Sequence, residues 1–183
     1  MQGAFCPLFR LHGHRGGPHP PPNQCGGTNG DNEVWNLAKD NTHYTGITRV
    51  MHLRENLREY VAEINEITVA TGLPMLRPMF LEWPDDAGCA GADVEDQFMF
   101  GPRWLVAPVT AYKAASRSVY LPKLPAGQDW IHFFTLKSHG GGGARAVVPA
   151  PVDEFPLFYI RDEWNYPHHP LAGPQETTKD PRQ

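Results

Sequence analysis

The sequence predicts an α/β part followed by a β part: one strand, loop and helix, and then a small antiparallel β-sandwich. Three observations carry this prediction. An apolar run at residues 3–9 has no polar face, and residues 45–71 repeat apolar positions at spacings of three and four. Beyond residue 103 the chain contains short runs rich in Val, Tyr, Phe and Trp. These patterns are typical of a buried strand, an amphipathic helix and short antiparallel strands.

The first element is the apolar run, which suits a strand covered on both faces, as in a parallel barrel. A charged cluster follows it directly and contains Arg10, His12, His14 and Arg15. In a barrel of alternating strands and helices, the carboxyl ends of the strands carry the functional site. The position of this cluster therefore indicates that it lines a site.

Residues 16–31 form the next segment, which is rich in Pro, Gly and Asn and is expected to be a long loop between strand and helix. A loop of this length either shapes a binding site or is an excursion on the surface, and the composition favours neither. The helix that follows is predicted at residues 45–71, with Thr42 as a candidate cap and Gly72 and Pro74 as the stop. Its charged face indicates contact with solvent (Arg54, Glu55, Arg58, Glu59 and Glu63).

The stretch at residues 76–109 has apolar runs at 76–83 and 103–109, with a Pro and Asp turn and a small-residue insert between them, and is interpreted as a hinge between two modules. The β part begins at its second run. Strands are predicted at residues 103–109, 117–121, 130–135, 144–148 and 157–160, separated by Pro and Gly turns. The tail at residues 166–183 is polar and rich in Pro, so we expect it to be disordered. The predicted division is thus 1–102, 103–165 and 166–183.

Composition argues against several functional classes. The formal charge is −4 and the 16 Lys and Arg residues form no run, so nucleic acid is not an expected partner. No segment approaches 18 consecutive apolar residues, so no membrane segment is expected. Cys6, Cys25 and Cys89 are odd in number and widely spaced, which favours free thiols.

No cofactor is expected either, because the chain has none of the glycine-rich phosphate-binding motifs and no G-x-S-x-G elbow. His12, His14, His19 and Cys25 are near one another in sequence and are therefore candidate zinc ligands. Structural zinc sites use paired ligand steps such as C-x-x-C, and no such pairing with a cysteine occurs here. No metal ligands are therefore assigned, and the oligomeric state is left open.

Several motifs follow one another at consistent spacing. They read RPMFLEWPDD from Arg77 and EDQFMFGPRWLVAPV from Glu95, and then SVYLP, DWIHFFT and APVDEFPLFYIR. Upstream, FRLHG begins at Phe9 and DNEVW at Asp31. Together these motifs resemble glycoside hydrolase family 31, the α-glucosidase and α-xylosidase family. The resemblance implies that residues 1–102 are the end of a (β/α)8 barrel, with its last βα unit, and that residues 103–165 are the proximal C-terminal β-sandwich.

The resemblance also implies site residues. In the family an Arg-x-His at the end of the last barrel strand places the His on hydroxyl groups of the sugar whose bond is cut, which corresponds to His12 and, more weakly, to Arg10. Arg10 is interpreted mainly as a brace for the barrel rim or for a carboxylate. Trp35 either stacks on a sugar ring or, as we favour, packs under the loop. The two carboxyl groups of a retaining glycosidase belong to earlier barrel strands.

No carboxylate in this chain matches the family's catalytic positions. Asp85 and Asp86 follow Pro84 and are interpreted as turn residues. The sequence therefore predicts the C-terminal part of a retaining α-glycosidase for terminal α-glucosides or α-xylosides, with a weak lean to xylosides, and no activity for this chain alone. Because the first strand has no preceding element, the chain looks cut at its front, and an incomplete gene model is one explanation.

The alternative prediction is a non-catalytic carbohydrate-binding or interaction module left after truncation. It rests on aromatic residues that form a stacking platform only if they are exposed; we expect them to be buried (Trp83, Trp104, Trp130, Phe133 and Phe134).

Overall fold

The computed structural model describes residues 39–40, 42–151 and 153–161. The chain separates into two units, with the first division between Arg58 and Glu59, and each unit is described by itself. The predicted strand at residues 3–9, the loop at 16–31 and the tail at 166–183 lie outside the described residues. The barrel part of the predicted fold class therefore stays a prediction.

The amphipathic run predicted at residues 45–71 forms two helices instead of one, α3 (Thr42–Asn56) and α4 (Arg58–Thr71), separated at Leu57. Neither proline nor glycine lies at this junction. Like charges do recur across it at the spacing i, i+4, for example Glu55 with Glu59, and such pairs weaken a helix locally. The single-helix prediction is corrected accordingly.

The first unit contributes α3, whose buried apolar side chains are Val50 and Leu53. Leu57, directly after the helix, is buried too, and each of the three is no more than 2% exposed. Their spacing of three and four is the predicted apolar stripe. The charged side of the same segment is exposed, and Arg58 forms an ion pair with Glu55 there. This confirms the predicted solvent face for that pair.

The second helix, α4, begins the other unit and ends as predicted. Gly72 follows Thr71 with φ of 77°, in the left-handed region that favours glycine, and its N–H donates to the Thr68 carbonyl at 2.8 Å. Only Tyr60 and Ile64 of this helix are fully buried.

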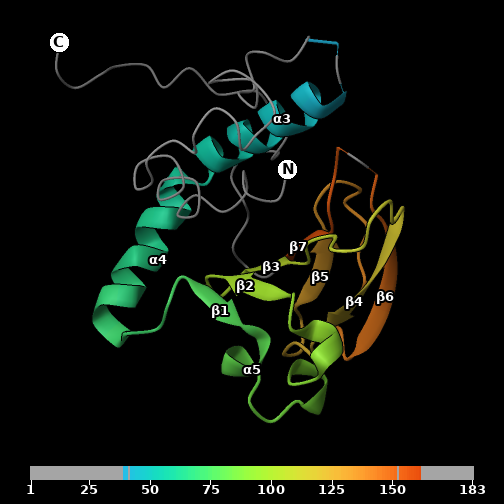
Figure 1. Ribbon diagram of the computed structural model, residues 1–183. Helices are drawn as coiled ribbons and strands as arrows, with labels where there is room; N and C mark the ends of the chain where they lie inside the picture. The colour runs from blue at the N-terminus through green and yellow to red at the C-terminus, as the bar shows by residue number, and fades with distance from the viewer. Residues whose placement is uncertain (1–38, 41, 152, 162–183) are drawn as a thin grey trace, which may run out of the picture. The chain divides into compact units, whose positions relative to one another are not determined.

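The rest of the second unit is built from two antiparallel sheets (Figure 1). One has five strands in the order β1-β2-β3-β7-β5, and the other has two, β4 and β6. The strand bounds are β1 (Leu76–Pro78), β2 (Phe98–Phe100), β3 (Trp104–Val106), β4 (Ser116–Leu121), β5 (Asp129–His132), β6 (Ala144–Pro149) and β7 (Leu157–Arg161). The five strands predicted after residue 103 are confirmed, with ends that differ by no more than three residues.

Residues 76–102, the first part of the predicted hinge, contain regular structure of their own. They supply β1 and β2, which pair with each other and, through β2, with β3. Between them lie the short helix α5 (Met79–Glu82) and the 3-10 turns η2 (Ala87–Cys89) and η3 (Ala92–Val94). The sheet therefore begins at Leu76, because β2 forms hydrogen bonds with the free side of β3 and β1 forms hydrogen bonds with β2.

One row of side chains crosses all five strands of the larger sheet. Register partners run from Arg77 on β1 through Met99, Leu105 and Phe158 to His132 on β5. All five are buried, with 3% exposure at the two ends and none in the middle. The row thus has an apolar centre and a basic or titratable side chain on each edge strand. Inward-pointing polar groups at edge strands oppose the addition of further strands.

The apolar centre of this row joins the main core, to which both sheets contribute. The smaller sheet adds Val119, Leu121 and Val148, and the larger sheet adds Trp130 and Ile160 among others. Figure 1 shows β4 and β6 as a pair of long strands beside β5 and β7. A core shared by both sheets is what keeps the two-stranded sheet folded, since an isolated pair of strands is marginal in water.

Candidate functional site

The sequence-predicted site residues, His12 and Arg10, lie outside the described residues, as do the zinc candidates His14, His19 and Cys25. Their roles stay predictions. The site that can be built from described residues is the polar junction between α4 and the larger sheet, together with the buried basic groups at the two sheet edges.

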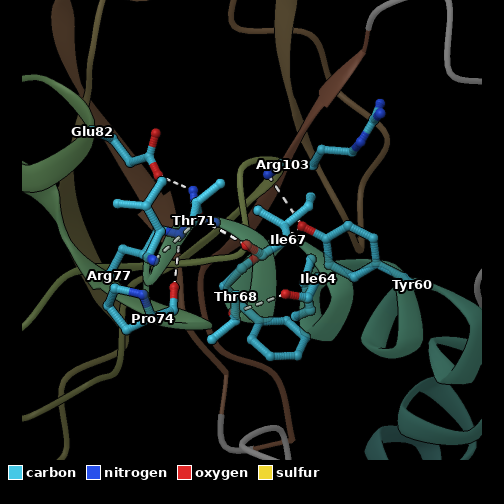
Figure 2. Close-up of polar contacts among 11 residues, drawn as sticks. Tyr60, Ile64, Ile67, Thr68, Thr71, Pro74, Arg77, Glu82 and Arg103 are labelled. Carbon is cyan, nitrogen blue, oxygen red and sulfur yellow. Dashed lines mark hydrogen bonds and ion pairs between the residues drawn. The ribbon is translucent and has the colours of Figure 1, made fainter.

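The junction is organised by Tyr60 of α4 (Figure 2). Its hydroxyl donates to the Phe100 carbonyl at 2.8 Å and accepts from the Arg103 N–H at 3.2 Å. The Tyr60 and Phe100 rings meet edge to face, with centroids 5.8 Å apart. Burial raises the pKa of Tyr60 well above its usual range, so the hydroxyl stays protonated and keeps its donor role. One side chain therefore satisfies backbone groups on both sides of the β2–β3 turn.

Gly101 makes this approach possible. Its φ is 59°, and its N–H donates to the Met75 carbonyl at 2.7 Å. A Cβ here would collide with the Tyr60 hydroxyl and come within 2.6 Å of Ile64 Cγ2. Glu63, one helical turn from Tyr60, lies 3.8 Å from the Arg103 guanidinium. The prediction that Glu63 belongs only to a solvent face is corrected, because it contributes to this junction.

Arg77 is the buried cation at the β1 edge. Its Nε donates to the Pro74 carbonyl at 2.8 Å, and its Nη1 bonds Glu82 at the end of α5 (Figure 2). Within the described residues its Nη2 has no hydrogen-bond partner. A buried guanidinium needs such partners, so these bonds hold the turn before β1 and the helix after it together.

His132 is the corresponding group at the β5 edge. Its Nδ1 lies 2.9 Å from Thr135 Oγ1 and accepts from the Thr135 N–H at 3.3 Å. The neutral ring therefore carries its proton on Nε2, and protonation of Nδ1 would remove the acceptor of the Thr135 N–H. Burial, with a smaller contribution from His139, lowers the pKa of His132 to about 4. Both rings pack edge-on against Phe158.

The carboxylates in the motif regions hold turns and strands. Asp86 accepts from the Gly88 N–H at 2.9 Å, which confirms its predicted turn role, and from the Tyr120 hydroxyl at 2.9 Å. Asp96 bonds Thr110 Oγ1 at 3.0 Å and Arg117. Although burial alone would raise the pKa of Asp96, the bonds from Arg117 lower it overall.

The exposed carboxylate Asp93 pairs with Arg145. Asp86, Asp93 and Asp96 are therefore each engaged in contacts that hold turns and strands.

The aromatic residues weighed as a stacking platform are mostly inside the protein. Trp104, Trp130 and Phe133 are at most 1% exposed, while Trp83 and Phe134 are half-buried. Trp130 also donates its indole N–H to the Pro122 carbonyl at 2.8 Å. The expected burial is confirmed for the first three, so these rings form no exposed platform for a sugar.

The described part of the chain contains no group of three or more His, Cys, Asp or Glu side chains that could hold a metal ion. In that same part, none of the helices combines the length and apolar character that a membrane span requires. Cys89 is a free, buried thiol whose pKa is raised by burial to about 12, so it is not a nucleophile at neutral pH.

Sequence reasoning missed the roles of Tyr60, Arg77 and His132. The apolar spacing at residues 45–71 admits either Tyr60 or Val61 at this turn, and the structure buries Tyr60. The two bonds of Tyr60 depend on residues 40 or more positions away. Arg77 was visible only as a basic residue inside an apolar run. That position is itself a signal, because Arg is rarely buried without a partner.

The described residues of the second unit form a small, sheet-rich domain of two antiparallel sheets around a shared core. The model of the glycosyl hydrolase family 31 C-terminal domain matches residues 72–163, and the chain belongs to this family. The predicted family is thereby confirmed.

Similar proteins support this assignment. The chain is 31% identical over 158 residues to an isomaltosyltransferase of Sporosarcina globispora, covering 85% of this chain and 13% of the relative. It is 30% identical over 168 residues to α-xylosidase A of Aspergillus niger, covering 86% of this chain and 22% of the relative. A family 31 α-xylosidase from a soil metagenome, solved with xylose, has a TM-score of 0.65 and 36% identity, covering 76% and 19% of the two chains. The chain thus spans between 13% and 22% of the length of the curated relatives named here.

Proposed function

We propose that the chain is the C-terminal part of a retaining α-glycosidase, which hydrolyses the O-glycosyl bonds of terminal α-glucosides or α-xylosides. The observation that carries this proposal is the family match at residues 72–163, together with sequence similarity that extends over 85% or more of the chain. The share of each relative that the chain covers leaves room for a barrel elsewhere in a longer protein.

In this proposal the catalytic carboxyl groups are contributed by other parts of that protein. A retaining enzyme needs two carboxyl groups about 5 to 5.5 Å apart, one as nucleophile and one as acid and base. The engagement of Asp86 and Asp96 in turn and strand contacts supports a non-catalytic role for the described acidic residues. Residues 1–102 would complete the barrel, and residues 103–165 would form the proximal C-terminal domain. The strands β1 and β2 precede residue 103 in sequence but belong to the larger sheet of that domain.

His12 is the proposed substrate-binding residue. A neutral imidazole can donate a hydrogen bond to one sugar hydroxyl and accept one from another. Arg10 offers a planar set of donors suited to a carboxylate, so its proposed role is to hold an acidic group ionised or to brace the barrel rim. Neither residue transfers a proton in the reaction.

An α-xyloside is the preferred substrate of the proposed enzyme. Two of the similar solved structures with identities of 36% and 35% are described as α-xylosidases, the second from Xanthomonas citri. Similar proteins also include an isomaltosyltransferase and sulfoquinovosidases. An aryl α-glucoside therefore belongs in every assay as the competing substrate.

The first test uses the pure 183-residue chain with aryl α-xyloside and aryl α-glucoside. No turnover above the buffer rate is expected, because the proposed reaction needs carboxyl groups from other strands. Measurable turnover that persists after further purification of the chain would show that the chain carries its own catalytic pair.

The second test uses a longer protein that contains this chain and hydrolyses the xyloside. His12→Ala is expected to lower kcat/KM by about 10- to 100-fold, because loss of a partner for a buried hydroxyl costs about 1 to 3 kcal/mol. His168→Ala in the polar tail is the matched control and is expected to leave kcat/KM unchanged. If both substitutions lower kcat/KM equally, or if neither lowers it, His12 is not a substrate-binding residue.

The alternative function, a non-catalytic carbohydrate-binding or interaction module, has less support. It needs exposed aromatic rings, and Trp104, Trp130 and Phe133 are buried. Titration of the pure chain with xylose and glucose separates the two proposals, since the module predicts binding by this chain without any other segment.

A further inference from the structure

Helix α4 is anchored to the larger sheet by a small set of contacts. Of its 14 residues only Tyr60 and Ile64 are fully buried, and both meet Gly101. Val61, Ile67 and Thr68 are half-buried, and the remaining surface of the helix is largely exposed, with Val69 at 81%. A helix of this length is marginal by itself in water, so its order depends on these contacts.

The receiving surface lies at the turn between β2 and β3, within residues 100–103. It offers the Phe100 carbonyl as acceptor, the Arg103 N–H as donor and the Arg103 guanidinium opposite Glu63. Gly101 supplies the gap into which the Tyr60 hydroxyl fits. This surface therefore matches a helix that carries Tyr, Glu three residues later and Ile four residues later.

The two partners belong to different parts of the sequence. The family C-terminal domain matches from residue 72, whereas Tyr60, Glu63 and Ile64 precede it. The structure nevertheless groups α4 with the sheet, because the second unit begins at Glu59.

We propose that residues 100–103 are a docking site for the helix that leads into the domain, and that α4 is held there by Tyr60 as an element that opens separately from the sheet. The folded unit then begins at Glu59 and not at the start of the family match. Elements with few buried side chains are the ones that open locally while the rest of a domain stays folded. This inference goes beyond the proposed function and does not depend on any glycosidase activity.

Hydrogen exchange of the full chain, followed by mass spectrometry, tests the docking site. In the wild type, amides of α4 are expected to be protected but to exchange faster than those of β3 and β7. Tyr60→Phe keeps the ring and removes both hydroxyl bonds, and it is expected to raise exchange in α4 about tenfold, since each bond contributes about 0.5 to 1.5 kcal/mol. Exchange in β3 and β7 is expected to stay within twofold of the wild type.

The matched control is Tyr112→Phe, which removes a hydroxyl from a ring that is 90% exposed and is expected to change neither set of amides. Unprotected α4 amides in the wild type would contradict the docking site, and that outcome needs no variant. An equal rise in α4 and in the sheet after Tyr60→Phe, or no rise in either, would contradict separate opening.

Gly101→Ala provides a second route from the other side of the contact. Gly101→Ala is expected to raise the exchange rate of α4 by loss of the same contact that Tyr60→Phe weakens. The rise in exchange rate in the double variant is therefore expected to be much smaller than the product of the rises in the two single variants. Residues that act at one contact are non-additive in this way. Strictly multiplicative effects would place Tyr60 and Gly101 in independent contacts and overturn the proposal.

Discussion

Two glycines in the second unit make a matched pair for measuring how closely α4 approaches the sheet. Gly101 and Gly127 both have positive φ, 59° and 88°, so alanine is strained at either position. A Cβ at Gly127 would meet nothing within 4 Å, whereas one at Gly101 would meet Tyr60 and Ile64. The difference in the free energy of unfolding between the two alanine variants therefore measures the steric contact separately from the backbone strain.

We expect Gly127→Ala to lower the free energy of unfolding by about 1 to 2 kcal/mol, the cost of a left-handed residue with a side chain. Gly101→Ala is expected to cost at least about 1 kcal/mol more, because an overpacked contact adds about 1 to 3 kcal/mol. Urea unfolding of both variants measures this difference. Equal losses would mean that α4 does not lie against Gly101 in solution.

His132 makes stability depend on pH. Its folded-state pKa is lowered to about 4 from an ordinary value of 6.5, so the unfolded chain binds a proton in that range while the folded chain does not. Stability is therefore fully present above about pH 6.5 and falls as pH decreases toward 4, by at most about 1.4 kcal/mol per pH unit. Below that window this contribution no longer changes.

His132→Gln is expected to remove most of this slope, and urea unfolding at pH 4.5, 5.5 and 7 measures it. The matched control is His52→Gln, on an exposed position of α3, which is expected to keep the wild-type slope. Carboxylates such as Asp96 lose their contribution at lower pH and remain in both variants. An unchanged slope in His132→Gln would show that the buried ring is already accessible to protons.

At the residue scale, the sequence predicts which side chains are buried better than it predicts their hydrogen-bond partners. Tyr60 falls in the apolar stripe of its helix and Asp86 follows a proline turn, and both positions are as the local pattern predicts. The Tyr60 bonds to Phe100 and Arg103 are not predictable in this way, since no local spacing links residues 40 and 43 positions apart. The positive φ of Gly101 has a meaning only once that contact is known.

At the scale of elements, Gln97 protects the outer edge of β4. Its side-chain amide donates to the Tyr120 carbonyl at 3.0 Å and accepts from the Tyr120 N–H at 3.0 Å. Gln97 is 2% exposed, so this one residue replaces the hydrogen bonds that a neighbouring strand would make.

Gln97→Met keeps the length of the side chain and removes both bonds. We expect the free energy of unfolding to fall by about 1 to 3 kcal/mol, because two backbone groups of β4 lose their partner. Gln128→Met, at a half-buried position just before β5, is the control and is expected to change stability by less than about 0.5 kcal/mol. A loss at Gln97 no larger than the loss at Gln128 would mean that the edge of β4 is satisfied in another way.

Element prediction succeeded where strands are long and rich in β-branched and aromatic residues, as in β4 and β7. It failed for β1 and β2, which have three residues each and lie 19 residues apart, so neither shows an alternating pattern. β2 (FMF) is at least as apolar as the α5 segment (MFLE), while β1 (LRP) has Arg77 at its centre. Pairing of β1 with β2 and of β2 with β3 distinguishes strand from helix here, and pairing is a tertiary property.

At the scale of the whole molecule, the described residues form a small domain in which two sheets pack around one core. The two sheets share one core, the edges carry Arg77, His132 and Gln97, and α4 is attached at Gly101. The predicted substrate ligands His12 and Arg10 belong to the part of the chain outside the described residues. The sequence could suggest their roles only through the motif FRLHG, because hydroxyl recognition depends on the arrangement of several strands.

The most direct test of the central claim is the nucleotide sequence upstream of Met1 in the source transcript or genome, read in frame. The account predicts that it continues into further alternating strands and helices that carry two catalytic carboxylates, so that the encoded longer protein hydrolyses an aryl α-xyloside. An in-frame stop codon immediately before Met1 would contradict this account. It would mean that the chain is made as it stands and does not act as part of a glycosidase encoded in one chain.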